Sequence, residues 1–138
     1  MNIILDASAA INLTNGGLLQ TAVKLPNCNL SIGPAVLGEC HTVKNELTRN
    51  IDDGRIELLD DSIVSASRFL HLLESHQLGL GETECIAFAE TGDLVIGCDD
   101  RAARATIASM YGQHRLIGTI GIIELAHKND IKSLTEAE

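Results

Sequence analysis

Two aspartates come directly after apolar segments that are typical of buried strands. Asp6 follows residues 3–5 (Ile-Ile-Leu), and Asp99 follows the segment 94–98, which begins Leu-Val-Ile. A buried carboxylate without a partner costs several kcal/mol, so an acid at this position must meet a cation, a metal ion or water. Open parallel sheets bind ligands beyond the carboxyl ends of their strands. If the two segments are neighbouring strands, Asp6 and Asp99 therefore face each other across a cleft.

Further acidic residues lie near helix starts that can reach the same edge. Glu82 and Glu84 open an otherwise apolar helical segment, and Asp100 follows the second strand-terminal acid. Glu39 lies on or beside an apolar helical stripe, and Glu46, seven residues later, lies near the same face and is the alternative to it. Carboxylates that converge in this way repel one another without a counter-ion. Their hard oxygen atoms suit Mg²⁺ or Mn²⁺, which makes a divalent-metal site the chemical hypothesis.

Simpler interpretations of the same residues stay open. An acid at a helix N-terminus, such as Glu82 or Glu84, commonly offsets the helix dipole. A strand-terminal aspartate that precedes a serine, as Asp6 does, often serves only as a helix cap, and Asp100 fits the same role. Each of these patterns is weak alone, and the metal-site hypothesis rests on their coincidence in one fold pattern.

The amino-acid composition limits the classes of protein to which the chain can belong. The chain has 138 residues with 12 Gly and 2 Pro, its hydrophobic fraction is 45%, and we expect one domain over residues 1–138. Two Phe, one Tyr and no Trp are too few for a base-stacking platform. A net charge of −9 argues against a broad basic surface for nucleic acid. An acidic chain can still cut nucleic acid if metal ions lie between its carboxylates and the phosphates.

The first residues and the cysteines bear on the compartment. Residues 1–6 lack the basic and long apolar regions of an export signal, and no stretch approaches the ~18 apolar residues of a membrane span. The four cysteines form no CxxC pair, which favours reduced, buried thiols; a zinc site with His41 or His114 is the alternative. We therefore expect a cytoplasmic protein without membrane association.

The elements that must position these side chains alternate between short apolar runs and helical patterns. This order predicts an α/β fold with three layers, in which helices flank a central, mostly parallel sheet. Strands are expected at residues 3–5, 29–32, 56–59, 94–96 and 116–117. Helices are expected after Ser8, from 34 through 47, from 61 or 62 to 73, from 82 to about 91, from 101 to 110 and from 119 to 128.

The order and spacing of these segments resemble a PIN domain over nearly the whole chain. Within that family they are similar to small prokaryotic PIN proteins related to VapC-type toxins. The matching segments are residues 3–8 (IILDAS), 34–39 (PAVLGE), 80–89 (LGETECIAFA), 94–101 with 103–104, and 118–126 (GTIGIIELA). The resemblance implies a three-layer PIN-like fold and a ribonuclease that uses Mg²⁺ or Mn²⁺ to hydrolyse RNA phosphodiester bonds.

Carried over residue by residue, the resemblance assigns an acidic pocket. Asp6 and Asp99 match the aspartates that close the first and fourth strands of the family, and Asp100 assists Asp99. Glu39 matches the glutamate five residues after the helix-opening proline, and Glu82 matches the third acidic position. The expected catalytic acids are Asp6, Glu39, Glu82 and Asp99, and the expected metal ligands are Asp6, Glu82, Glu84, Asp99 and Asp100.

Three polar residues accompany the acids, and two positions depart from the family pattern. Ser8 matches a polar position that orients the first aspartate. Arg101 and Arg104 follow the acidic edge, where they either grip a flanking phosphate of the substrate or pair with the acids. Cys98 stands where many relatives have Thr or Ser, so we expect a hydroxyl contact to be missing there. Glu82 replaces the aspartate of many relatives, which lengthens its reach by one methylene.

The resemblance also implies partners. Single-stranded or looped RNA is the expected substrate, because a metal held in a cleft needs an accessible backbone. A toxin-type protein implies a small antitoxin, and self-association into a homo-oligomer is common in the family. The alternative function is a non-catalytic PIN-like module that binds protein or RNA, motivated by the charge of −9 and the scarcity of aromatic residues. A phosphoacceptor domain is disfavoured, since Asp6 is a lone acid and no lysine directly follows residues 116–117.

Overall fold

Five short strands form one parallel sheet, which confirms the sheet expected from the sequence. The computed structural model describes the backbone of residues 1–137 and the side chains of residues 1–129. The strands are β1 (Asn2–Leu5), β2 (Asn29–Ile32), β3 (Ile56–Leu58), β4 (Leu94–Gly97) and β5 (Leu116–Ile117). Every neighbouring pair is parallel and the order is β3-β2-β1-β4-β5, so β1 is central.

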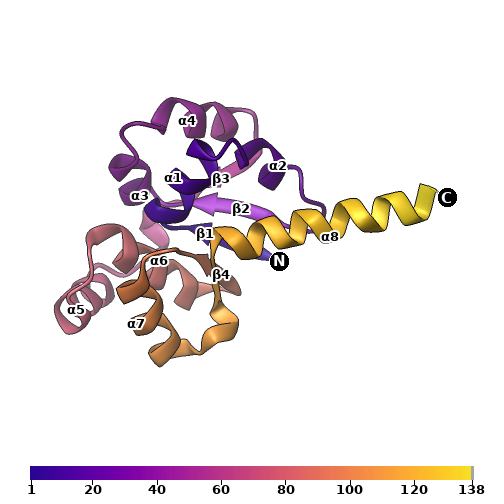
Figure 1. Ribbon diagram of the computed structural model, residues 1–138. Coiled ribbons are helices and arrows are strands. Elements are labelled where there is room, and N and C mark those ends of the chain that lie inside the picture. Colours follow the sequence, from indigo (N-terminus) through magenta and orange to yellow (C-terminus); the bar gives the residue numbers. More distant parts are fainter. Residues whose placement is uncertain (138) are drawn as a thin grey trace.

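Helices cover both faces of this sheet, which confirms the three-layer α/β architecture (Figure 1). In Figure 1, α1, α2 and α4 lie above the sheet, whereas α5, α6 and α7 lie below it, and α8 runs away from the body. The helices are α1 (Ala7–Asn15), α2 (Leu19–Val23), α3 (Pro34–Glu39), α4 (Lys44–Asp52), α5 (Ala66–His76), α6 (Leu80–Thr91), α7 (Arg101–Tyr111) and α8 (Thr119–Ala137). Two 3₁₀ turns, η1 (Asp61–Ile63) and η2 (Gln113–Arg115), complete the described elements.

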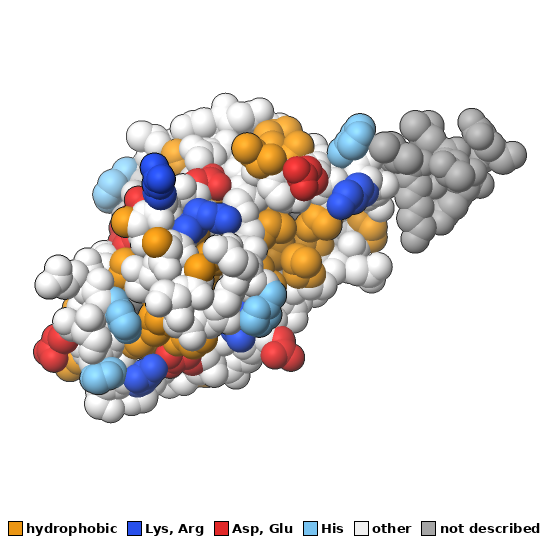
Figure 2. Space-filling model, turned by 60° about the horizontal axis from the view of Figure 1, so that its bottom comes forward, with side chains coloured by type: hydrophobic (Ala, Val, Ile, Leu, Met, Phe, Trp, Pro, Cys, Tyr) orange, Lys and Arg blue, Asp and Glu red, His pale blue; other side chains and the backbone are white. Residues whose placement is uncertain are grey.

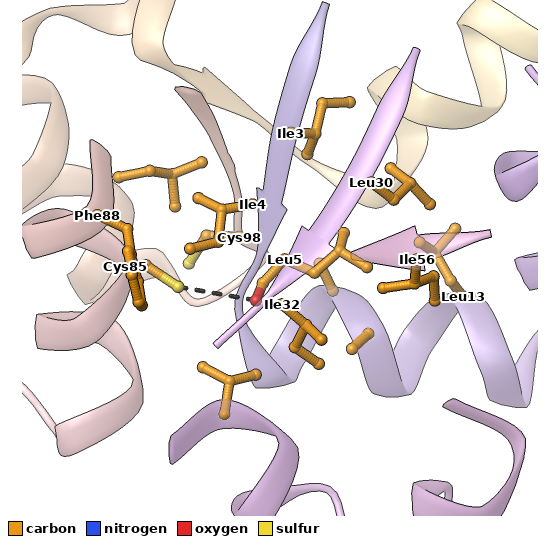
Figure 3. Close-up of a cluster of buried hydrophobic side chains, with 14 of the residues drawn as sticks. Ile3, Ile4, Leu5, Leu13, Leu30, Ile32, Ile56, Cys85, Phe88 and Cys98 are labelled. Carbon is orange, nitrogen blue, oxygen red and sulfur yellow. Dashed lines mark hydrogen bonds between the residues drawn. The ribbon is translucent and has the colours of Figure 1, made fainter. Parts of the chain in front are cut away.

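The centre of the sheet is apolar because β1 is covered on both faces. Residues 3–5 are fully buried, as their continuous apolar run predicts. Figure 3 shows that Phe88 and Cys85 of α6 approach this strand from one side, and Leu13 of α1 from the other. The Cys85 thiol lies 3.7 Å from the carbonyl oxygen of Leu5. β1 is therefore a rigid base for the residue that follows it.

The strand order reverses between β1 and β4. From β1 the chain adds β2 and β3 on one side, and it then returns to place β4 and β5 on the other. Open α/β sheets bind ligands at such a switch, beyond the carboxyl ends of the strands. The pairing extends past β1, because the backbone N–H of Asp6 donates to the carbonyl oxygen of Gly97 at 2.8 Å. Asp6 is therefore fixed at the switch point.

The prediction of a single helix over residues 34–47 is wrong. Two helices, α3 and α4, occupy this segment, and a turn at residues 40–43 separates them. Cys40 has φ −88° and ψ 53°, which is outside the helical region. A glycine and two β-branched residues lie next to the break, and all three are poor helix formers. Glu39 and Glu46 therefore lie on different helices and do not share the helical face that their spacing suggests.

Other helix boundaries also differ from the expected ones. The helix expected to open at residue 61 or 62 begins only at Ala66, because residues 61–63 form the separate 3₁₀ turn η1 and Ser65 is the N-cap of α5. α6 begins at Leu80 rather than at residue 82, because Gly79 provides the N-cap. α8 continues past the expected end at residue 128. Within the described residues, no helix combines the length and the apolar composition needed to cross a bilayer.

Candidate active site

Asp6 and Asp99 lie at the ends of adjacent strands and are connected through one hydroxyl. The β1–β4 register pairs Leu5 with Gly97, which brings Asp6 beside the residues that follow β4. The Ser8 hydroxyl donates to Asp6 Oδ2 at 3.2 Å and accepts from the Asp99 backbone N–H at 3.0 Å. The expectation that the two strands are neighbours is confirmed, and Ser8 contacts both strand ends.

Asp6 is held by three hydrogen-bond donors and is only 3% exposed. Besides Ser8, the Ala7 backbone N–H donates to Oδ1 at 2.6 Å, and the Cys98 thiol lies 3.1 Å from Oδ2. Burial, and then the negative charge of Asp6, raise the pKa of Cys98 to about 12, so the thiol keeps its proton and can donate it. The contact expected to be missing at Cys98 is therefore present, with sulfur in place of oxygen.

Asp99 is fixed by residues that the sequence reasoning missed. Thr119 donates to it twice, through its backbone N–H to Oδ1 at 2.8 Å and through its hydroxyl to Oδ2. Asn12 Nδ2 donates to Oδ2 at 2.7 Å. Partial burial opposes ionisation, but the hydrogen bonds outweigh it and lower the pKa of Asp99. A signal was available, since Asn12 is four residues after Ser8 on the same helix face and Thr119 comes just after β5.

The pKa of Glu82 is raised, in part by the negative charges of nearby acids. Burial is the main cause that raises its pKa, followed by the charge of Asp6, with smaller contributions from Asp100 and Glu39. Asp6, Asp100 and Glu39 are therefore close enough to Glu82 for their negative charges to act on it. Added positive charge between them would relieve that repulsion.

The same acids also satisfy backbone donors at helix starts. Glu82 Oε2 accepts from the N–H of Gly79 at 2.8 Å, and Glu39 Oε1 accepts from the N–H of Gly81 at 3.0 Å. Asp100 is the N-cap of α7 and its Oδ1 accepts from the Ala103 N–H at 2.8 Å. The simpler capping interpretation is thus confirmed for Asp100, for Asp6, which is the N-cap of α1, and, through its side chain, for Glu82.

Glu84 belongs to a different part of the fold. Its carboxylate accepts from the backbone N–H groups of Ala35 at 2.8 Å and Val36 at 3.2 Å, so both oxygens cap the start of α3. The residue is 6% exposed, and burial raises its pKa by more than these two hydrogen bonds lower it. Glu46 lies on the first turn of α4. The structure therefore brings neither Glu84 nor Glu46 into contact with Asp6 or Asp99.

The two arginines differ in their surroundings. Arg104 is half-buried, and its Nη1 donates to the Cys98 carbonyl oxygen at 2.7 Å. Arg101 is exposed at the start of α7. A cavity of about 420 Å³ beside Asp99 is lined by Arg104 but not by Asp6. A larger apolar groove of about 700 Å³ lies between α3, α5 and α6, where Glu84 is the nearest of the candidate acids.

Basic side chains are sparse on the visible surface. Figure 2 shows lysine and arginine scattered singly over one face, with apolar side chains exposed between them. Such a surface lacks the continuous basic band that grips a nucleic-acid backbone.

The described residues contain no three His, Cys, Asp or Glu side chains grouped so that they could hold a metal ion. Hydrogen bonds to backbone N–H groups account for this, since they turn Glu39 and Glu82 toward helix starts. The zinc alternative has no support there either, because His41 and His114 are both exposed. The chemistry of the donors still suits a hard divalent cation, because the acids around Glu82 offer carboxylate oxygens, the ligands that Mg²⁺ and Mn²⁺ prefer.

Comparison with known proteins decides the family. A family model described as the PIN domain matches residues 2–137. The chain belongs to the PIN-domain family. PIN domains are generally nucleases and typically use divalent metal ions. A comparison with curated proteins found no match.

A solved structure supports the PIN fold. The crystal structure of PAE2754 from Pyrobaculum aerophilum aligns with a TM-score of 0.66 and 17% sequence identity. The alignment covers 92% of this chain and 90% of the other. At that identity the likeness shows the shared fold. The family resemblance and the fold expected from the sequence are therefore both confirmed.

Proposed function

We propose that this PIN domain is a metal-dependent ribonuclease that hydrolyses RNA phosphodiester bonds. The observation that carries the proposal is the pair Asp6 and Asp99, which Ser8 connects at the strand-order switch of a family of nucleases. In this proposal Asp6, Glu39, Glu82 and Asp99 are the catalytic acids, and Asp6, Glu82, Asp99 and Asp100 hold Mg²⁺ or Mn²⁺. Glu84 is left with its helix-capping role.

Each residue has a physical task in this proposal. A bound divalent ion would lower the pKa of a water molecule and offset the charge of the scissile phosphate. Three donors hold Asp6 in one orientation, and those on Asp99 keep it ionised, so both acids are ready to accept a cation. Ser8 fixes the spacing of the two strand ends. Arg101 and Arg104 are the cations next to this edge that can contact a substrate phosphate.

The central experiment measures RNA cleavage in Mn²⁺. The parent protein is expected to cut RNA, and EDTA is expected to abolish the cutting. Asp6→Asn and Asp99→Asn should each lower the rate by about 100-fold or more while the far-UV circular dichroism is retained, because each removes a charge at the switch point.

Asp93→Asn is the matched control. Asp93 is exposed and precedes β4, at the opposite end of the strand from Asp99. The control should cut as fast as the parent. If Asp6→Asn and Asp99→Asn also cut at the parental rate, the site assignment is wrong.

Partners and compartment complete the proposal. We propose a toxin role with a small antitoxin partner, self-association and a cytoplasmic location, which the four free cysteines suit. Growth arrest on expression that Asp6→Asn relieves would support the toxin role. A short adjacent reading frame for a DNA-binding antitoxin would support the partner, and a monomer on size-exclusion chromatography with light scattering would contradict self-association.

A further inference from the structure

The cavity beside Asp99 shares Asp99 and Arg104 with the proposed active site, but Asp6 does not line it. Asp99 and Arg104 form its polar side, whereas β5 and the first turn of α8 form its apolar side. Its volume of about 420 Å³ lies within the range of roughly 300–1,000 Å³ that is common for small-molecule sites. A ligand here would contact Asp99, one of the proposed catalytic acids.

Ile120 makes the apolar side of this cavity unusual. It lies on the first turn of α8 and is 74% exposed, more than any other large hydrophobic side chain in the described part of the chain. An exposed aliphatic side chain beside a cavity offers an apolar contact, and removing such a surface from water is favourable. Because the chain has only two Phe, one Tyr and no Trp, aliphatic contact is what this site offers to the face of a base.

Gly118 keeps the polar side of the cavity open. A Cβ atom at this position would lie 3.0 Å from Asp99 Oδ1 and 3.4 Å from Arg104 Nη1. A larger residue would therefore push into the space between the carboxylate and the guanidinium. Glycine leaves both groups accessible from the cavity.

Arg104 retains capacity to bind an anion. Within the described residues it makes one hydrogen bond, from Nη1 to the Cys98 carbonyl oxygen, and it makes no ion pair. A guanidinium has five N–H donors, so most of them remain available to a phosphate. The Asp99 carboxylate nearby already accepts from Thr119 and Asn12, which offsets part of its repulsion of an anion.

We propose that this cavity binds one nucleotide of single-stranded RNA next to the bond that is cut. The base packs against Ile120 and the apolar wall of β5, and the adjoining phosphate meets Arg104. This inference rests on the proposed nuclease function and adds the subsite that positions the strand. A purely apolar peptide segment fits less well, because a carboxylate and a cation form the polar side of the cavity.

The test measures separately how much the bases and the backbone of the ligand contribute to binding. A fluorescent oligouridylate and an abasic ribose-phosphate chain of the same length are titrated against the protein in EDTA at low salt, where no cutting occurs. Parent protein should bind the oligouridylate more tightly than the abasic chain. Ile120→Ala should reduce oligouridylate affinity by at least about fivefold and leave the abasic affinity unchanged, because the lost contact is apolar.

Ile63→Ala is the matched control. Ile63 lies on η1, outside this cavity, and is 57% exposed, so the control removes the same groups from another exposed site. The control should bind both ligands as the parent does. Equal effects of the two substitutions, or no preference of the parent for bases, would overturn the subsite.

A second measurement keeps the two proposals distinct. In Mn²⁺, Ile120→Ala should raise KM for RNA by a similar factor with kcat little changed. If the parent cuts RNA and the variant has the same KM as the parent, the nuclease proposal is supported and the subsite proposal is wrong. If the protein binds RNA bases through Ile120 but cuts no RNA, the subsite proposal is supported and the nuclease proposal is wrong. If Ile120→Ala abolishes self-association but not RNA binding, the cavity serves a protein contact and the inference is wrong.

Discussion

At the scale of single residues, the site is a chain of hydrogen bonds that runs across two strand ends. The thiol of Cys98 and the hydroxyl of Ser8 both point at Asp6 Oδ2, and Ser8 also accepts from the backbone of Asp99. Because the Ser8 proton is directed to Asp6, the oxygen is free to accept from Asp99. The two acids are thus held at a fixed spacing by groups that carry no charge themselves.

The Cys98 contact predicts an order of stabilities. Cys98→Ala removes a fully buried group and one donor to Asp6, and it should lower the free energy of unfolding by roughly 1–3 kcal/mol. Cys98→Ser retains a donor and should lose less. Urea denaturation with the metal removed measures both. An alanine variant as stable as the parent, or a serine variant no better than alanine, would contradict the role of the thiol.

The raised pKa of Glu82 predicts that the Glu82→Gln variant is more stable than the parent protein at neutral pH but not in acid. In the folded protein the pKa lies above the ordinary value of 4.5, so folding favours the protonated form and stability falls as the pH rises from that value through the folded pKa. Glu82→Gln removes this loss and keeps an acceptor for Gly79. In EDTA at neutral pH the variant should melt roughly 1–4 °C above the parent, a modest shift because the group is partly solvated.

The gain from Glu82→Gln should vanish at a pH below 4.5, the ordinary glutamate value, where both proteins carry a neutral side chain. Differential scanning calorimetry across this range measures it, with Glu74→Gln as the control because Glu74 is exposed. A lower melting temperature for Glu82→Gln than for the parent at neutral pH would show that the repulsion is not significant.

Sequence reasoning could find Asp6 and Asp99 because each directly follows an apolar strand. It missed the partners of Asp99, although the helical spacing of Ser8 and Asn12 and the place of Thr119 just after β5 are signals for them. Asn12 is 87 residues away in the chain and Thr119 is 20 residues away, and only the folded sheet brings them together. It also took Cys98 as a lost hydroxyl, since sequence alone does not show which way a buried thiol points.

At the scale of elements, the short helix α3 depends on a residue from another helix. α3 has six residues, starts at Pro34 and has no side-chain cap of its own. Glu84 of α6 supplies both acceptors for its first N–H groups. A Cβ atom on Gly33 would lie 2.1 Å from Glu84 Oε1, so the glycine is needed for this carboxylate to approach. The contact positions Glu39, which ends the same helix.

This cap predicts a large and coupled loss of stability. Glu84→Ala leaves two backbone donors unsatisfied and should cost roughly 2–4 kcal/mol, whereas Glu74→Ala on an exposed face of α5 should cost less than about 0.5 kcal/mol. Gly33→Ala should be destabilising alone but less so in the Glu84→Ala background, because the clash partner is gone. Additive losses in the urea-denaturation cycle would argue against the shared contact.

Element types were predictable from the sequence, but one junction was not. The five strands lie within a residue or two of the expected places because each is a short apolar run. The break between α3 and α4 was missed since the apolar spacing continues across it, with Val36, Cys40, Val43 and Leu47 all buried. The turn at residues 40–43 buries the same side chains that a continuous helix would have buried.

At the scale of the whole molecule, the net negative charge limits where RNA can bind, which makes the proposed metal site more important for binding. With a net charge of −9, the chain repels RNA over most of its surface. If the chain binds RNA as proposed, binding is therefore local, through the proposed metal site, Arg101 and Arg104. Without metal, about two phosphate contacts give a slope of log K against log salt of roughly −1 to −2. Fluorescence anisotropy in EDTA over a salt series measures it, and a much steeper slope would indicate a basic surface elsewhere.

Metal binding should also stabilise the fold. A divalent ion present at ten times its dissociation constant adds about 1.4 kcal/mol to the free energy of unfolding, which corresponds to a rise in Tm of roughly 3–8 °C. The effect should be lost in Asp6→Asn and absent when KCl of equal ionic strength replaces MgCl₂. A parent protein that melts at the same temperature in EDTA and in millimolar Mn²⁺ would contradict the proposed metal site.

One further consequence concerns α8. Its first residue, Thr119, donates twice to Asp99, and Ile122, one turn later, is buried in the core, where α8 packs against α1 and α2. Only the far end of the helix extends past the body in Figure 1. The start of α8 is therefore anchored at two points, so that shortening Thr119 to alanine should release the Asp99 carboxylate while Ile122 keeps the helix in place.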